Sequence, residues 1–155
     1  FWARRGGGAF WNGEPMSVTD RPDLDGAFLA TGFPFRAKPA LDAYLNLFRE
    51  IFSRAGGARR CGAAALDLAF TAAGVFDGFF EFRLSPWDVA AGLLLIEEAG
   101  GVVTNLDGGS EIFAAGHVLA GGPGVHRALR LRIDELELSE AALRELGLGG
   151  RRLGD

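Results

Sequence analysis

Helical and strand-like segments alternate along most of this chain, and that alternation constrains the fold more than any other feature. Four segments have the apolar spacing or the alanine and leucine content of helices: from Pro39 to the Gly56-Gly57 pair, Gly62–Phe70, Asp88–Ala99 and Pro123–Ile133. Short apolar segments between them are typical of strands: Ala27–Thr31, Phe79–Phe82, Val102–Thr104 and His117–Ala120. Such an order favours α/β, a layered sandwich of sheet and helices, over a helical bundle or a β-sandwich.

The two ends of the chain differ from this central pattern. At the amino end, Phe1–Arg5, Ala9–Trp11 and Pro15–Val18 predict short strands, and Asn12-Gly13 is a strong hairpin signal because both residues tolerate positive φ. At the other end, residues 134–155 predict a peripheral tail with Ser139 capping a short helix. We therefore expect one domain over residues 1–133 and a tail over 134–155.

Composition narrows the function classes. A hydrophobic content of 48% over 155 residues suffices for one core, and the net charge of −4 provides no broad basic field for nucleic acid. The most apolar windows, 63–76 and 89–96, are too short or too interrupted to span a membrane, and the single cysteine excludes an intramolecular disulfide. We expect a cytoplasmic protein with no nucleic-acid or membrane partner. Because the chain starts at Phe1 inside a patterned segment, we also expect a fragment.

The segment from Glu81 to Gly92 is the best candidate for a site, because it predicts a strand, a loop and then a helix whose first turn carries Asp88. Ligands gather where strand ends meet helix N-termini, since the unpaired amides and the helix dipole make that end positive. Asp is also a favoured helix cap, and the residues alone favour that reading. Gly92, inside a predicted helix, indicates close packing against a neighbour.

A second helix entrance, Gly62-Ala63-Ala64-Ala65, exposes backbone N–H groups that suit an anion, although alanines also simply favour helix. Cys61 follows two arginines that could lower the pKa of its thiol, yet it is more typical of a small core residue. His117 and His126 have no metal-ligand spacing and are expected at the surface or at strand ends.

Several of these segments together resemble one family. Trp87-Asp88-Val89-Ala90-Ala91-Gly92, followed by Glu97 to Thr104, is similar to the C-terminal signature of inositol monophosphatases. Residues 59–69 resemble the family's second helix entrance, 77–81 its strand leading to the site, and 3–13 its hairpin. The resemblance extends to about residue 132 and implies the sugar-phosphatase type of fold, a mixed sheet flanked by helices.

The resemblance implies a magnesium-dependent phosphomonoesterase, sensitive to lithium and dimeric, that hydrolyses inositol monophosphate or a related sugar phosphate. Asp88 matches the family's late metal-binding and catalytic aspartate, and Glu81 matches its acceptor for a substrate hydroxyl. Gly62, Ala63 and Ala64 match the backbone stretch that lines the substrate pocket. Arg59 matches a position near the subunit contact.

One departure from the family is an absence. The family's other metal ligands lie upstream, in a Glu-Glu element and an Asp-Pro-x-Asp-Gly-Thr loop, and this sequence has neither. The resemblance therefore implies that the N-terminal half of the fold is missing and that these 155 residues alone are inactive. Two alternatives stay open: a related phosphatase acting on fructose bisphosphate, histidinol phosphate or a 3′-phosphoadenosine nucleotide, and a non-catalytic binding or assembly module.

Overall fold

A five-stranded mixed sheet forms the centre of the molecule in the computed structural model, which describes residues 1–34 and 41–135. Its strands are β4 (Phe28–Thr31), β5 (Gly57–Arg59), β6 (Gly78–Glu81), β7 (Val102–Thr104) and β8 (Val118–Gly121). Their order is β5-β4-β6-β8-β7. The first three are parallel to one another, while β8 is antiparallel to both of its neighbours, β6 and β7.

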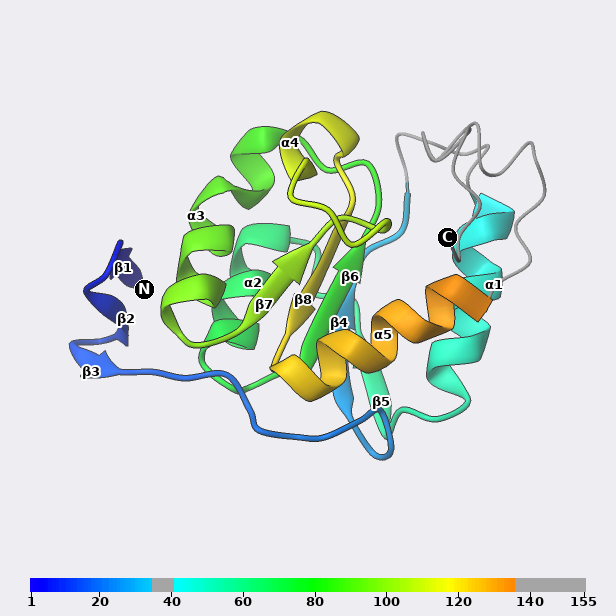
Figure 1. The fold of residues 1–155 in the computed structure, drawn as a ribbon, viewed down its shortest axis with the longest axis horizontal. Helices are drawn as coiled ribbons and strands as arrows, with labels where there is room; N and C mark the ends of the chain where they lie inside the picture. Colours follow the sequence, from blue (N-terminus) through cyan, green and yellow to red (C-terminus); the bar gives the residue numbers. More distant parts are fainter. Residues whose placement is uncertain (35–40, 136–155) are drawn as a thin grey trace.

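Helices cover both faces of this sheet. Figure 1 shows α1 (Leu41–Phe52) and α5 (Pro123–Glu135) on one side and α2 (Ala64–Ala72) and α3 (Pro86–Glu98) on the other. Side chains alternate accordingly, because successive strand residues point to opposite faces. Phe80 belongs to the core shared with α1 and α5, and its neighbour Phe79 belongs to the core shared with α2 and α3. The predicted α/β class and the mixed sheet flanked by helices are confirmed.

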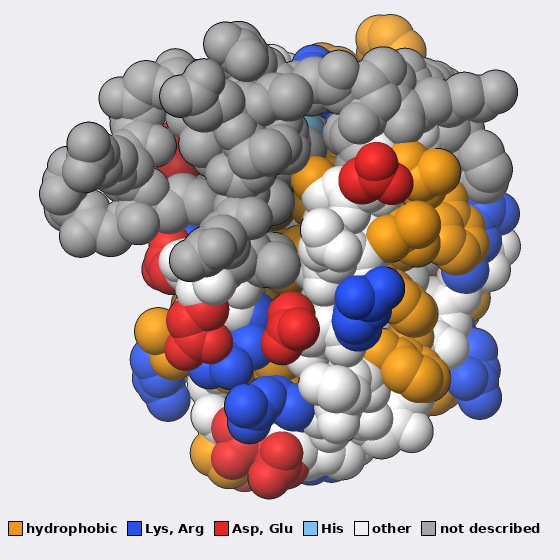
Figure 2. All heavy atoms as spheres, turned by 90° about the vertical axis from the view of Figure 1, so that its right-hand side faces the viewer, with side chains coloured by type: hydrophobic (Ala, Val, Ile, Leu, Met, Phe, Trp, Pro, Cys, Tyr) orange, Lys and Arg blue, Asp and Glu red, His pale blue; other side chains and the backbone are white. Residues whose placement is uncertain are grey.

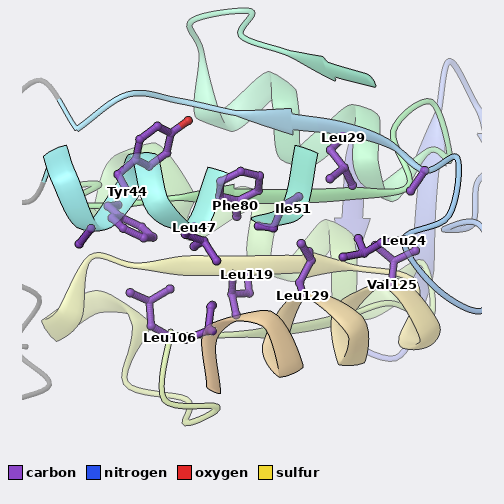
Figure 3. Packing of buried hydrophobic residues seen from close by; sticks show 14 residues of the cluster. Leu24, Leu29, Tyr44, Leu47, Ile51, Phe80, Leu106, Leu119, Val125 and Leu129 are labelled. Atoms are coloured by element: carbon purple, nitrogen blue, oxygen red, sulfur yellow. The ribbon is translucent and has the colours of Figure 1, made fainter. Parts of the chain in front are cut away.

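The core under α1 and α5 joins these two helices to the strands of the sheet. Leu47 and Ile51 of α1 and Leu129 of α5 belong to one core with Phe80 and Leu119 of the sheet, on the face that both helices cover (Figure 3). On the outer surface of these helices, basic and acidic side chains are interspersed, and hydrophobic side chains also reach the solvent (Figure 2). Neither sign of charge dominates the visible face.

The amino end forms a separate three-stranded antiparallel sheet, as predicted, from β1 (Trp2–Arg4), β2 (Gly8–Trp11) and β3 (Glu14–Pro15). It packs on α3. The Glu98 carboxylate near the end of that helix accepts hydrogen bonds from the backbone N–H groups of Gly6 (2.7 Å) and Gly8 (2.9 Å). These bonds hold the pKa of Glu98 below its ordinary range and fix the sheet to the helix.

Element boundaries show where local patterns were insufficient. The third strand was predicted over Pro15–Val18 but ends at Pro15, and neither β5 nor the short helix α4 (Ile112–Ala115) was predicted. The predicted helix start at Pro39 and the cap at Ser139 lie outside the described residues. No helix within residues 1–34 and 41–135 is long and apolar enough to cross a membrane.

Candidate active site

The carboxyl ends of the parallel strands β4 and β6 meet the N-termini of α2 and α3 around a cavity of about 310 Å³. This is the position where α/β sheets usually bind ligands. Among the residues that line the cavity are all those predicted for the site: Gly62, Ala63, Ala64, Glu81 and Asp88. These residues lie on two separate segments of the sequence, and the fold brings them together around one cavity.

Asp88 is in the first turn of α3 and is half-buried. The backbone N–H of Ser85 donates to its Oδ2 at 2.9 Å, and the N–H of Asp88 donates to the carbonyl of Ser85 at the same distance. Asp88 therefore caps α3 and lines the cavity at once. The capping interpretation and the site interpretation apply to the same side chain, because a carboxylate has more acceptor sites than one cap occupies.

Glu81 is the last residue of β6. Its carboxyl group lies against Gly32, the residue directly after β4. A Cβ added at Gly32 would collide with the carboxyl group of Glu81, so only glycine leaves room for it. The strand predicted over Ala27–Thr31 stops directly before Gly32, and the sequence pattern alone assigned Gly32 no part in the site. A signal for this role exists in the sequence. Gly32 directly follows one predicted buried strand, and the acidic Glu81 lies at the end of another.

A buried pair of hydroxyl groups connects α1 to the end of β4, where Thr31 lines the cavity. The Thr31 hydroxyl donates to the carbonyl of Phe80 at 2.7 Å, so the Tyr44 hydroxyl, 3.0 Å away, is the donor to Thr31. Burial raises the pKa of Tyr44, with a smaller raising effect from Glu81 and a lowering effect from Arg60. Tyr44 thus stays a neutral donor and ties α1 to the strand end under the cavity.

The entrance to α2 has the backbone geometry expected for an anion site. Gly62 has φ 94°, a left-handed conformation that disfavours a side chain. Ala63, the N-cap residue, is extended and makes no side-chain cap bond. Because the first amides of a helix lack intrahelical partners, those at the start of α2 present positive charge to the cavity that Gly62, Ala63 and Ala64 line.

Two arginines also line the cavity, and sequence reasoning assigned neither of them to it: Arg60 and Arg83. Arg83 lies in the loop between β6 and α3 with φ 61°. Arg59, which the family resemblance placed near a subunit contact, holds its guanidinium 4.7 Å from the centre of the Phe28 ring. Its neighbour Arg60 is therefore the cavity residue of the pair.

Cys61 differs from its prediction as a core residue, because it is exposed. Partial desolvation, and then a hydrogen bond with Asp67, raise the pKa of its thiol; this is opposite to the lowering that its arginine neighbours suggested. Of this hydrogen-bonded pair, Asp67 is the buried residue, with 1% of its surface exposed. The two histidines are buried rather than at the surface, although His117 does stand directly before a strand, and His126 bonds the Thr104 hydroxyl at 2.9 Å.

The described residues contribute little to a metal site on their own. Within that part of the chain, no group of three or more His, Cys, Asp and Glu side chains could hold a metal ion. Glu81 and Asp88 still place two carboxylates on one cavity. Magnesium is commonly held by one or two carboxylates together with waters and substrate phosphates. The cavity could therefore provide some of the ligands of such a site.

Comparison with known proteins decides the family. The model of the inositol monophosphatase family matches residues 1–137. The chain belongs to the inositol monophosphatase family. This match covers the N-terminal sheet and all three segments that line the cavity, residues 31–33, 60–64 and 81–88.

Individual members of the family are similar over about half of their length. "Nus factor SuhB" from Pseudomonas aeruginosa is 50% identical over 136 residues, which are 86% of this chain and 50% of that protein. "Fructose-1,6-bisphosphatase/inositol-1-monophosphatase" from Aquifex aeolicus is 41% identical over 126 residues, 81% of this chain and 47% of that protein. The crystal structure of extragenic suppressor protein suhB from Bartonella henselae has a TM-score of 0.82 at 41% identity, covering 86% of this chain and 51% of that one.

Proposed function

We propose that the protein carrying this chain is a magnesium-dependent phosphomonoesterase that hydrolyses inositol monophosphate or a related sugar phosphate. The observation that carries the proposal is the convergence of Gly62, Ala63, Ala64, Glu81 and Asp88 on one cavity of about 310 Å³. Family membership supports the reaction class. Because the chain spans about half of its relatives, the activity belongs to the complete gene product, and we propose that these 155 residues alone are inactive.

Each residue then has a distinct task. Asp88, oriented by its cap on α3, supplies one carboxylate ligand for magnesium, which when bound provides Lewis-acid stabilisation of the phosphate and an activated water. Glu81, seated over Gly32, accepts a hydrogen bond from a substrate hydroxyl. The first amides of α2 offer donors to an oxygen of the ligand. We therefore propose that the reacting phosphate binds toward α3 and that the polyol binds between β6 and α2.

The decisive experiment is Asp88→Asn in the complete gene product. We expect magnesium-dependent phosphate release from inositol 1-phosphate to fall by about 10²-fold or more, because a carboxylate charge at the metal is lost. The fold should remain, since the amide oxygen of Asn can still accept the capping bond from Ser85. Asp42→Asn is the matched control, because Asp42 is also an acid in a first helical turn but lies outside the cavity. Equal turnover in both variants would remove Asp88 from the site.

Glu81→Gln tests the substrate side of the proposal. Loss of the charged acceptor should weaken turnover of polyhydroxylated phosphates more than that of a simple aryl phosphate. A panel with inositol 1-phosphate, fructose bisphosphate, histidinol phosphate and a 3′-phosphoadenosine nucleotide then separates the inositol-type enzyme from its relatives. Inhibition by lithium and a homodimer are further parts of this proposal that rest on the family, and a cytoplasmic location is a part that rests on the composition of the sequence.

A second candidate is a non-catalytic assembly module, in keeping with the relatives named "Nus factor SuhB". Outside the candidate active site, α3 and α4 border a hollow of about 220 Å³ whose lining combines Leu93, Leu94 and Phe113 with the charged side chains of Arg5 and Glu97. Phe113 is 54% exposed. If the complete gene product releases no phosphate from any member of the panel with magnesium present, the module is favoured over the enzyme.

A further inference from the structure

One buried tyrosine lies behind the cavity and contacts three of the residues that line it. Tyr44 of α1 is fully buried, so it does not touch a ligand in the cavity itself. Its hydroxyl oxygen lies 3.0 Å from that of Thr31. Its ring meets the rings of Phe33 and Phe82 edge-on, with centroids 5.5 Å and 5.6 Å away. Because Thr31, Phe33 and Phe82 all line the cavity, Tyr44 supports its wall from behind.

The Thr31 hydroxyl is engaged within the protein on both sides. A threonine hydroxyl has one proton to donate, and Thr31 donates it to the carbonyl of Phe80 at 2.7 Å. The same oxygen accepts the proton of the Tyr44 hydroxyl. The three groups form a chain of hydrogen bonds that runs from Tyr44 through Thr31 to the backbone of β6. We therefore expect the Thr31 hydroxyl to act through Phe80 and not as a donor to a ligand.

This chain of hydrogen bonds ends on the peptide group that leads into Glu81. The Phe80 carbonyl and the Glu81 nitrogen belong to one planar peptide group, so a bond to the carbonyl restricts the orientation of the backbone from which Glu81 continues. Thr31 is the last residue of β4 and the register partner of Phe80. The next residues on the two strands are Gly32 and Glu81, whose carboxyl group lies against that glycine. The hydroxyl pair thus stands one residue behind the carboxylate on both strands.

A second buried threonine shows what a purely structural hydroxyl looks like in the same chain. Thr71 of α2 is also fully buried, and its hydroxyl donates to the carbonyl of Asp67, one helical turn earlier, at 2.8 Å. Thr71 is not among the residues that line the cavity. The bond made by Thr31 is of similar length but joins two strands at the cavity. This difference separates a role in the site from a contribution to the fold alone.

We propose that Tyr44 and Thr31 are positioning residues for substrate recognition, which hold the Glu81 carboxylate where it accepts a hydroxyl of the substrate. The inference rests on the proposed role of Glu81 in the phosphatase and deepens it. The hydroxyl groups of Tyr44 and Thr31 act through the Phe80–Glu81 peptide group. Their effect belongs to binding of the hydroxylated part of the substrate and not to the chemical step at the phosphate.

Tyr44→Phe in the complete gene product removes the hydroxyl and keeps the ring contacts. We compare inositol 1-phosphate with phenyl phosphate, which has no hydroxyl groups on its ring, both with magnesium. We expect KM for inositol 1-phosphate to rise about 3- to 10-fold, the range of one neutral hydrogen bond, with kcat retained. The kcat/KM for phenyl phosphate should not change. An unchanged KM for inositol 1-phosphate, or an equal loss on both substrates, would overturn the proposal.

Substitutions of Thr31 test the same chain of hydrogen bonds from its middle. Thr31→Val keeps the shape of the side chain and removes the hydroxyl, whereas Thr31→Ser keeps the hydroxyl. We expect Val to raise KM for inositol 1-phosphate at least as much as Tyr44→Phe, and Ser to retain the wild-type value. Because the hydroxyls act in series, adding Tyr44→Phe to Thr31→Val should raise KM no further. Thr71→Val is the matched control and should leave KM unchanged. Failure of Ser to preserve KM, or an equal effect of Thr71→Val, would refute the role.

The NMR chemical shift of the Glu81 carboxyl carbon separates this inference from the proposed function. The signal is assigned by its loss in Glu81→Gln, and its measurement requires no turnover. We expect the shift to change in Tyr44→Phe and Thr31→Val and to stay constant in Thr31→Ser and Thr71→Val. If it does so while the wild-type protein releases no phosphate, the phosphatase proposal fails and the positioning of Glu81 stands. If the shift is the same in all four variants, the positioning is refuted whatever the turnover.

Discussion

Gly92 of α3 is the point where the packing of two helices can be tested against the geometry of the cavity. A Cβ added there would lie 2.6 Å from Cβ and 2.5 Å from Cδ1 of Leu68 in α2, whereas ordinary contacts begin at 3.4 Å. A different rotamer of Leu68 can move Cδ1 but not Cβ. The two helices must therefore separate locally by about 0.8 Å to admit the methyl group of Gly92→Ala.

Two opposing terms set the expected stability of Gly92→Ala. Overpacking a fully buried contact costs about 1–3 kcal/mol, while replacing a helical glycine by alanine contributes about 1 kcal/mol of helix propensity. Since rotamer changes cannot relieve the clash, the overpacking cost should lie in the upper part of its range, about 2–3 kcal/mol, and we expect a net loss of about 1–2 kcal/mol in the free energy of unfolding. The same separation moves Asp88 away from Gly62 and Ala63 across the cavity, and misplacement of about 1 Å can cost on the order of 10²-fold in rate.

The assay combines denaturant unfolding of the complete gene product with its phosphate release. Ala91→Gly, at the exposed neighbouring position of the same helix, measures the propensity term alone and should destabilise by about 1 kcal/mol. If Gly92→Ala instead stabilises the protein by about as much as Ala91→Gly destabilises it, with kcat/KM unchanged, the close packing of α2 on α3 does not set the cavity.

Three further predictions follow from single contacts. Because the pKa of Glu98 is lowered from 4.5, the stability it contributes is lost as the pH falls below that value, and Glu98→Gln should reduce this acid dependence in tryptophan fluorescence. Burial raises the pKa of Asp67 from 3.8, so its contribution declines as the pH rises above that value; Asp67→Asn should gain stability relative to wild type between acidic and neutral pH, as measured by denaturant unfolding. Gly32→Ala should displace the Glu81 carboxylate and reproduce the substrate selectivity of Glu81→Gln, whereas Gly57→Ala, with ordinary contacts, should leave turnover unchanged.

Local sequence patterns were sufficient for the elements with long or strongly apolar segments. Gly92 in the predicted helix indicated a close neighbour, and the structure identifies it as Leu68. The strand β5 escaped prediction because its three residues, Gly57–Arg59, have neither β-branched side chains nor an apolar alternation. It is held by pairing with β4, a contact between residues far apart in the chain that no local window contains.

The candidate site shows the same division between local and long-range information. The positions of Asp88 and of Gly62–Ala64 follow from helix starts, which the sequence marks. The contact of the Glu81 carboxyl group with Gly32 arises only because β4 and β6 lie side by side. Roles that require two distant segments to meet were therefore the ones that sequence reasoning missed.

Capping and ligand binding at Asp88 are compatible because they use different properties of the carboxylate. The bond from Ser85 N–H to Oδ2, 2.9 Å long, engages one of about four acceptor sites and fixes the side-chain rotamer. A rotamer fixed in advance lowers the entropy lost when a ligand binds. In the proposed enzyme, the cap thus orients the carboxylate toward the cavity, so the strength of the cap and the affinity for magnesium should vary together. Ser85→Pro, which removes the N–H donor while retaining Asp88, should weaken magnesium-dependent turnover; unchanged magnesium dependence in that variant would show that the two roles are independent.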